Sequence, residues 1–282
     1  MNTPSLLDHY LTRWNLADPQ LLTQTMTSQV YTVRDQTAIM ILKLLASSEE
    51  NERRGAVALQ YFAGHGAVRL IRADAQAQLM EYAAGDELVT LVERGEDAQA
   101  THIIAQIISQ LHGVERPVPP SGLVLLDRWF ESLFRQAERD RGAGSASSYV
   151  RAAARAGWLL NTQREIRVLH GDIHHRNIRQ SARGWLAFDP KGLIGERTYD
   201  CANSLCNPVM PELVHNEARL LATAAIFADT LALDLQRVLA WTYAYACLNA
   251  SWWLHIKADN AEEIVQWFLK VAQILEPHLE RV

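Results

Sequence analysis

The 282-residue chain contains only three cysteines, Cys201, Cys206 and Cys247, and no two of them form a CxxC pair. An odd number of cysteines without metal-binding spacing excludes a disulfide framework and indicates free, buried thiols in a reducing compartment. The first residues, MNTPSLLDHYLTRWNL, lack the basic segment and the apolar run of a signal peptide. We therefore expect a cytoplasmic protein.

The sequence also lacks any basic stretch that resembles a nucleic-acid-binding patch. Its net charge is -5 and its pI is about 6.1, which argues against a nucleic acid as partner. A mildly acidic protein is compatible with a small cationic ligand. Nothing in the sequence determines the oligomeric state.

One long segment without Asp, Glu, Lys or Arg covers residues 238–256, VLAWTYAYACLNASWWLHI. Its length is sufficient to span a bilayer. However, it contains Thr, Tyr, Asn, Ser and His side chains, and polar groups are costly in lipid. We therefore expect a buried core helix and no membrane association.

The chain changes character after about 80 residues. Two runs within residues 21–45 flank the polar turn RDQT, and two shorter runs flank ADAQ, which is typical of antiparallel strands. Between them, EENERRGAVALQYFAG has helical spacing and ends at Gly64 and Gly66. Helical patterns dominate the rest. The sequence predicts an α+β protein with a small antiparallel β lobe with one helix (1–83) and a larger, mainly helical lobe (84–282).

The segment VLHGDIHHRNI, residues 168–178, carries the strongest chemical signal. Kinases use an H-x-D motif, an Asn five residues after the Asp, and a second Asp about a dozen residues further on. Here Asp172 is followed by Asn177, and Asp189 lies twelve positions later in AFDPKG. A short hairpin between Asn177 and Asp189 is expected to bring the two side chains together.

A lysine and an acidic partner complete this set. Lys43 lies in a strand that is expected to be buried, where an unpaired ammonium group is costly. Glu52 on the following helix is its expected partner, and Glu50 is the alternative. Each feature is weak alone, but the ordered set within a β-then-α layout favours phosphoryl transfer.

The segments LHGDIHHRNI, GWLAFDPKGLIGERTYDCAN and YFAGHGAVRL resemble the aminoglycoside/hydroxyurea antibiotic-resistance kinase family, in its streptomycin 6-phosphotransferase-like branch. The resemblance implies a protein-kinase-like two-lobed fold and ATP-dependent, Mg²⁺-dependent phosphorylation of a hydroxyl group on a small molecule such as streptomycin. The alternatives are a metabolite kinase of the same fold, with choline, homoserine or a sugar as acceptor, and a nucleotide-binding protein without activity.

The resemblance also implies roles for individual residues. Asp172 corresponds to the catalytic base and Lys43, supported by Glu52, to the lysine on the α- and β-phosphates. The Mg²⁺ ligands are expected at Asn177 and Asp189, and the backbone groups that bind adenine at Glu81 and Ala83. The phosphate-covering loop is expected at TQTMTSQ, which lacks glycine and contains Ser28.

The remaining polar residues allow more than one interpretation. We expect His170 to brace the loop through a backbone hydrogen bond, and Asp200 to do so by accepting backbone N–H groups. A zinc site at the histidines is an alternative. One of His174 and His175 is expected to contact the substrate, and we assign His175 while leaving the choice open. The candidates for binding a cationic substrate are Asp259, Glu262 and Glu263, although acidic residues are also favoured at any helix start.

Overall fold

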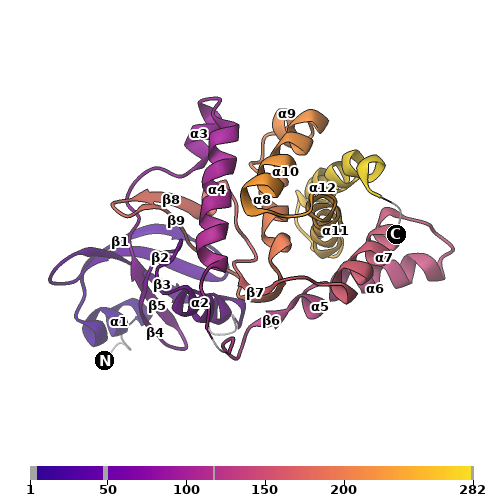
Figure 1. The fold of residues 1–282 in the computed structure, drawn as a ribbon. Helices are drawn as coiled ribbons and strands as arrows, with labels where there is room; N and C mark the ends of the chain where they lie inside the picture. The colour runs from indigo at the N-terminus through magenta and orange to yellow at the C-terminus, as the bar shows by residue number, and fades with distance from the viewer. Residues whose placement is uncertain (1–4, 47–49, 117, 281–282) are drawn as a thin grey trace.

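The computed structural model describes residues 5–46, 50–116 and 118–280, without the side chains of residues 50–52. A first lobe, built on an antiparallel sheet, lies beside a larger second lobe that consists mainly of helices (Figure 1). The predicted α+β, two-lobed fold class is confirmed. The expected boundary after residue 83 stays a prediction.

The first lobe contains a five-stranded sheet with the order β1-β2-β3-β5-β4, formed by β1 (Ala17–Gln24), β2 (Ser28–Arg34), β3 (Ile39–Leu45), β4 (Leu70–Ala73) and β5 (Ala77–Glu81). The two turns read from the sequence are confirmed. Asp35 Oδ1 accepts hydrogen bonds from the Thr37 and Ala38 N–H groups, and Asp74 does the same for the turn before β5. Strand β1, in which every residue is exposed, pairs with β2, and the sequence pattern does not separate the two strands.

A second helix in this lobe corrects the expectation of one helix. Helix α1 (Leu6–Trp14) begins with a capping box in which Ser5 and Asp8 exchange side-chain and backbone hydrogen bonds. Its Tyr10 and Trp14 pack in one core with Leu42 and Leu44 of β3. Because side chains alternate across a strand, Lys43 points to the opposite face of the sheet.

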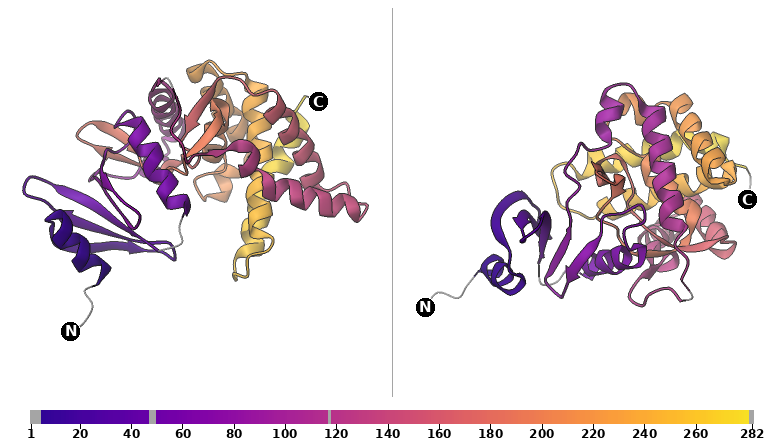
Figure 2. Two further views of the ribbon diagram at one scale, coloured as in Figure 1. Left: turned by 90° about the horizontal axis from the view of Figure 1, so that it is seen from below. Right: turned by 60° about the vertical axis from the view of Figure 1, so that its left-hand side comes forward.

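Helix α2 (Glu50–Phe62) lies on the side of the sheet that faces the second lobe (Figure 2, left). Its Leu59 and Phe62 belong to the same buried core as the helices of the second lobe. The side chains of Glu50 and Glu52 lie outside the described residues, so their expected pairing with Lys43 stays a prediction.

The second lobe is organised around two long helices, α4 (Asp97–His112) and α11 (Leu235–Trp253). Helix α11 is buried from Arg237 to Ser251 and packs against its neighbours on several sides, which confirms the expected core helix. None of the described helices is long and apolar enough to cross a membrane. The other helices are α3 (Val89–Glu93), α5 (Leu126–Trp129), α6 (Glu131–Gly142), α7 (Ser148–Asn161), α8 (Ala202–Leu205), α9 (Pro211–Val214), α10 (Glu217–Leu231) and α12 (Ala261–Leu275).

The second lobe also contains short strands, and one hairpin of these contacts the first lobe. A three-stranded sheet has the order β6-β10-β7, and a hairpin consists of β8 and β9; the bounds are β6 (Val124–Leu125), β7 (Ile166–Leu169), β8 (Ile178–Ser181), β9 (Gly184–Ala187) and β10 (Leu193–Glu196). Ala187 of β9 exchanges backbone hydrogen bonds with Gly66 and Val68 of the first lobe, both 2.9 Å long. In the turn of this hairpin, Arg183 forms an ion pair of 2.6 Å with Glu81 of the first lobe. The hairpin is therefore attached to both lobes.

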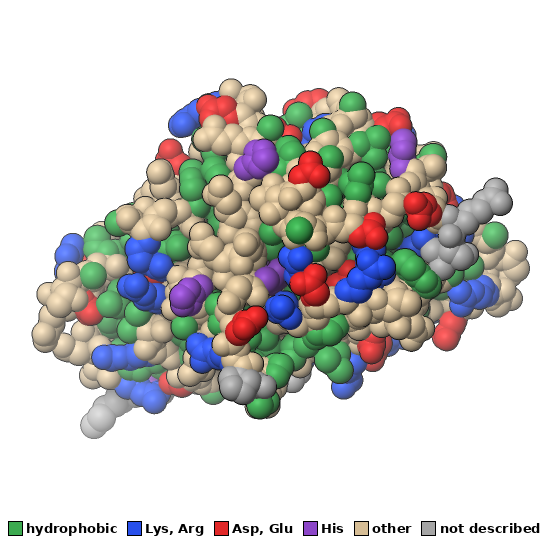
Figure 3. Space-filling model, viewed as in Figure 1, with side chains coloured by type: hydrophobic (Ala, Val, Ile, Leu, Met, Phe, Trp, Pro, Cys, Tyr) green, Lys and Arg blue, Asp and Glu red, His purple; other side chains and the backbone are tan. Residues whose placement is uncertain are grey.

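The expected free thiols are confirmed, because Cys201, Cys206 and Cys247 are all free and buried. Burial raises the pKa of all three thiols, to about 12 for Cys247. On the face drawn in Figure 3, basic and acidic side chains are interspersed. Among the described side chains on that face, no extended patch of one charge is visible.

Candidate active site

The loop after β7 is held by a buried aspartate. Asp200 accepts hydrogen bonds from the backbone N–H of His170 (3.0 Å) and of Gly171 (2.7 Å), and it contacts His112 Nε2 at 2.8 Å. Burial would raise the pKa of Asp200, but His112, His170 and the hydrogen bond from the Gly171 N–H lower it. The predicted bracing role of Asp200 is confirmed.

His170 fixes the same loop from inside. Its Nε2 lies 3.1 Å from the carbonyl oxygen of Phe188, and its Nδ1 lies 3.3 Å from the Asp172 N–H. Burial lowers the pKa of His170, which favours a neutral ring that donates through Nε2 and accepts through Nδ1. The expected structural role is confirmed, and the ring joins the Asp172 loop to the residue before Asp189.

Asp172 is half-buried and has distinct partners for its two oxygens. Oδ1 accepts a hydrogen bond from Asn203 Nδ2 at 2.8 Å, and Oδ2 lies 3.0 Å from the ammonium group of Lys191. Asn177 Nδ2 donates to the Asp172 carbonyl oxygen at 2.9 Å and lies 3.4 Å from Oδ2. The Asp172 carboxylate is therefore held in one orientation by Asn203 on Oδ1 and Lys191 on Oδ2.

The β8–β9 hairpin brings the backbone of Asn177 next to Phe188, the residue before Asp189. The Phe188 N–H donates to the Asn177 carbonyl oxygen at 2.9 Å, one position beyond the Ile178–Ala187 pair. Asp189 then takes a left-handed backbone conformation, with φ 60°. Such a conformation is uncommon for a residue with a side chain and is often found at functional sites.

Lys43 and Asp189 form an ion pair between the two lobes. Lys43 Nζ lies 2.6 Å from Asp189 Oδ1, and Lys191 Nζ lies 3.5 Å from Oδ2. Burial alone would raise the pKa of Asp189, but the two ammonium groups outweigh it and lower the pKa to about 2. Asp189 is therefore ionised at neutral pH.

Asn177 and Asp189 fit a magnesium site by the chemistry of their donor atoms. Mg²⁺ prefers oxygen ligands and is usually held by one or two carboxylates together with substrate phosphates. The ionised Asp189 carboxylate supplies one such ligand. The Asn177 amide donates through its nitrogen, so its oxygen remains the atom suited to a metal.

Three contributors to this network were missed from the sequence. Lys191 contacts both carboxylates, Asn203 orients Asp172, and His112 contacts Asp200. Lys191 carries a signal, because it lies two residues after Asp189 in DPKG. Asn203 and His112 carry none, since only the folding of α8 and α4 brings them to the loop.

The residues assigned to adenine and to the phosphate loop lie in the first lobe, outside this contact network. Ser28 begins β2 and its N–H bonds to Thr25 Oγ1 at 3.1 Å in the β1–β2 turn. The Glu81 N–H donates to the carbonyl oxygen of Arg69 at 2.9 Å, and Ala83 is buried. Their roles stay predictions.

The acidic candidates for the substrate site lie around the start of α12. Asp259, Glu262 and Glu263 are all exposed. None of the contacts between described residues joins them to Asp172. Their role therefore stays a prediction.

The His175 ring likewise makes no hydrogen bond to Asp172. Its side chain is 1% exposed, and neither ring nitrogen has a hydrogen-bond partner among the described residues. Its burial argues against the assignment to the substrate site. His174 is half-buried and its Nδ1 contacts the Arg176 N–H at 3.4 Å. In the described part of the chain, no three His, Cys, Asp or Glu side chains form a metal cluster.

The lowered pKa of His175 is expected to reduce the stability of the folded protein in acid. Burial lowers its pKa to about 3, Arg219 and His174 add to this effect, and Asp97 opposes it. Between pH 6.5 and 3 the unfolded chain binds a proton at this position that the folded chain does not bind. We expect His175 to reduce the free energy of unfolding by roughly 3 kcal/mol between pH 7 and pH 4.

The test is urea unfolding at pH 7, 5.5 and 4 for the wild type and His175→Leu. Because the two ring nitrogens have no described partner, leucine should be tolerated at pH 7. The variant should lose less stability on acidification than the wild type. The exposed His65 provides the matched surface control, His65→Leu. Identical pH dependence in the wild type and His175→Leu would contradict the prediction.

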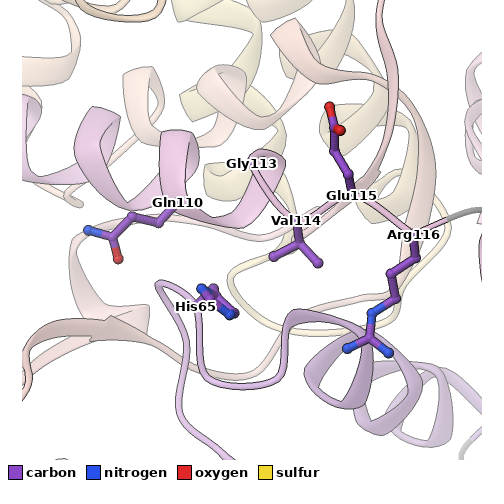
Figure 4. A pocket seen from close by; sticks show the side chains of 6 residues that line it. All are labelled: His65, Gln110, Gly113, Val114, Glu115 and Arg116. Atoms are coloured by element: carbon purple, nitrogen blue, oxygen red, sulfur yellow. The ribbon is translucent and has the colours of Figure 1, made fainter.

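Two surface cavities lie elsewhere. One of about 400 Å³ is lined by His65, Gln110, Gly113, Val114, Glu115 and Arg116 (Figure 4). A second of about 530 Å³ shares Val114, Glu115 and Arg116. In Figure 4 the Glu115 and Arg116 side chains point in different directions, so the charged groups do not converge. Neither cavity includes Asp172, Asn177 or Asp189, and the candidate active site remains the network around these residues.

The chain is similar to several known kinases and phosphotransferases. The profile of the aminoglycoside/hydroxyurea antibiotic resistance kinase family matches residues 13–256. Streptomycin 3''-kinase of Klebsiella pneumoniae is 36% identical over 249 residues, which cover 86% of this chain and 90% of that protein. Streptomycin 6-kinase of Streptomyces griseus is 27% identical, with 88% and 82% covered. A thermostable mutant of aminoglycoside phosphotransferase APH(4)-Ia, solved with AMP-PNP and hygromycin B, has a TM-score of 0.66 at 13% identity, with 95% and 96% covered.

Proposed function

Because the chain belongs to the aminoglycoside/hydroxyurea antibiotic resistance kinase family, we propose that it transfers the γ-phosphate of ATP to a hydroxyl group of a streptomycin-like aminoglycoside. The observation that carries this proposal is the row of alternating charges Asp172–Lys191–Asp189–Lys43, with successive contacts of 3.0, 3.5 and 2.6 Å. Such a row provides a base, a metal ligand and phosphate-binding cations within one network.

The residues around Asp172 and Asp189 have separate tasks in this proposal. Asp172 accepts a hydrogen bond from the acceptor hydroxyl, orients its oxygen toward the γ-phosphorus, and takes the proton as the new bond forms. Asn203 holds the carboxylate in that orientation. Lys43 exchanges its contact with Asp189 for the α- and β-phosphates. Mg²⁺ held by Asn177 and Asp189 would neutralise the phosphate charge.

The identity of the acceptor is supported by the relatives. The 36% identical relative is named a streptomycin 3''-kinase, whereas the relative named a 6-kinase is 27% identical. We therefore propose streptomycin as the acceptor and its 3''-hydroxyl as the position modified. Streptomycin is a cation, which suits a protein with net charge -5. The exposed Asp259, Glu262 and Glu263 are its proposed acidic contacts.

The test is an acceptor panel with purified protein and Mg·ATP, monitored by ADP release. We expect turnover with streptomycin, and a phosphorus–proton NMR correlation should place the phosphate on the 3'' position. The panel should also contain hydroxyurea, choline, ethanolamine, homoserine and a hexose. Turnover with choline or another metabolite but not with streptomycin would replace the aminoglycoside by a metabolic substrate. No ADP with any acceptor, despite nucleotide binding, would indicate a protein without kinase activity.

A further inference from the structure

Lys191 lies between the two carboxylates of the site. Its Nζ atom is 3.0 Å from Asp172 Oδ2 and 3.5 Å from Asp189 Oδ2, and its side chain is 32% exposed. Two carboxylates that share a partly buried site repel each other unless a cation lies between them. Lys191 supplies this cation, and its partial exposure leaves the ammonium group accessible to a ligand that enters from solvent.

The backbone of Lys191 is fixed on two sides. Its N–H donates to the carbonyl oxygen of His170 at 2.7 Å, which ties it to the catalytic loop. The next residue, Gly192, has φ 67°, and a Cβ atom there would lie 2.6 Å from the carbonyl oxygen of Arg54 in α2. Only glycine fits this approach. The ammonium group is therefore carried by a segment that is packed between the catalytic loop and α2.

We propose that Lys191 is a further catalytic residue, whose ammonium group contacts the γ-phosphate during transfer. This inference rests on the proposed kinase function and adds a second phosphate-binding lysine to Lys43. The two lysines divide the triphosphate between them. Lys43 binds the α- and β-phosphates, and Lys191 binds the end that is transferred.

The order of the charges assigns the γ-phosphate to Lys191. The acceptor oxygen must lie within hydrogen-bond reach of Asp172 and in line with the γ-phosphorus. Lys191 contacts Asp172 directly, whereas Lys43 contacts the far carboxylate, Asp189. A cation 3.0 Å from the base therefore faces the reacting end of the nucleotide.

The chemical step leaves Lys191 unchanged. A bond forms between the acceptor oxygen and the γ-phosphorus, and the bond from the γ-phosphorus to the β–γ bridging oxygen breaks, with its electron pair leaving on ADP. The acceptor proton goes to Asp172. Lys191 donates hydrogen bonds to the equatorial oxygens of the phosphoryl group, where charge is stabilised in the transition state. Its move from Asp172 to the phosphate also frees Oδ2 of the base.

The test separates binding of the third phosphate from binding of the first two. Calorimetry compares Mg·AMP-PNP with Mg·ADP for the wild type, Lys191→Met, Lys191→Arg and the exposed control Lys270→Met. We expect Lys191→Met to weaken AMP-PNP binding by about tenfold or more, because a charge-assisted hydrogen bond is lost, while ADP binding changes less than about twofold. Its kcat should fall by about 10²-fold. Lys191→Arg should recover part of both losses, and Lys270→Met should match the wild type.

The outcomes are distinct. An unchanged ratio of AMP-PNP to ADP affinity in Lys191→Met, whether both affinities are kept or both fall, would overturn the γ-phosphate contact while leaving the kinase proposal intact. A wild type that binds neither nucleotide would overturn the kinase function and this inference with it. Thermal unfolding of each variant shows whether it is folded, and Lys191→Arg keeps the test valid if methionine destabilises the loop.

Discussion

Asp172→Asn is expected to lower kcat by roughly 10²- to 10⁴-fold, the range for loss of a general base. The amide retains the size of the side chain and its contact with Asn203, but it cannot take the acceptor proton. Binding of Mg·ADP should stay within about twofold of the wild type, since Asp172 has no proposed contact with the diphosphate. Steady-state kinetics with streptomycin and calorimetry with Mg·ADP measure the two quantities.

The matched control for this variant is Asp127→Asn, at an exposed aspartate on α5. It should retain wild-type kcat and stability. If Asp172→Asn turned over streptomycin at the wild-type rate, Asp172 would not be the base. A variant that lost ADP affinity as strongly as kcat would instead point to a disturbed Lys43–Asp189 pair.

The parts of the site that the sequence predicts are those that follow one another along the chain. Asp172 and Asn177 lie on one loop and contact each other, and one hairpin leads from Asn177 to Asp189. The hairpin register then brings Asn177 next to Phe188, the residue before Asp189. Lys43 was identified because an ammonium group in a buried strand requires a partner. Asp189 is one such partner, and the expected pairing with Glu52 stays a prediction.

The parts that the sequence does not predict depend on packing between distant elements. His112 and Asn203 reach the loop only because α4 and α8 pack against it. His175 follows His174 in the motif, yet the 3-10 turn His175–Asn177 directs its ring into the interior. Helix α1 did have a local signal, the capping pair of Ser5 and Asp8, which was overlooked.

Asp200→Ala is expected to have the largest effect on stability, a loss of roughly 3 to 5 kcal/mol, because each buried donor left without an acceptor costs about 1–3 kcal/mol. The donors are the N–H groups of His170 and Gly171, and the ring of His112 loses the same partner. Urea unfolding at pH 7 measures the loss. The exposed Asp229 on α10 supplies the control, Asp229→Ala, which should remain within about 0.5 kcal/mol of the wild type.

Asp200→Asn distinguishes a lost acceptor from lost volume. Asparagine fills the same space and can still accept from one N–H group, but its own NH₂ group then faces another donor. It should therefore recover only part of the stability lost in Asp200→Ala. Because Asp200 anchors the start of the loop that carries Asp172, kcat should fall in both variants even where they remain folded. Full stability in either variant would show that the loop is held by His170 and its contact with Phe188 rather than by Asp200.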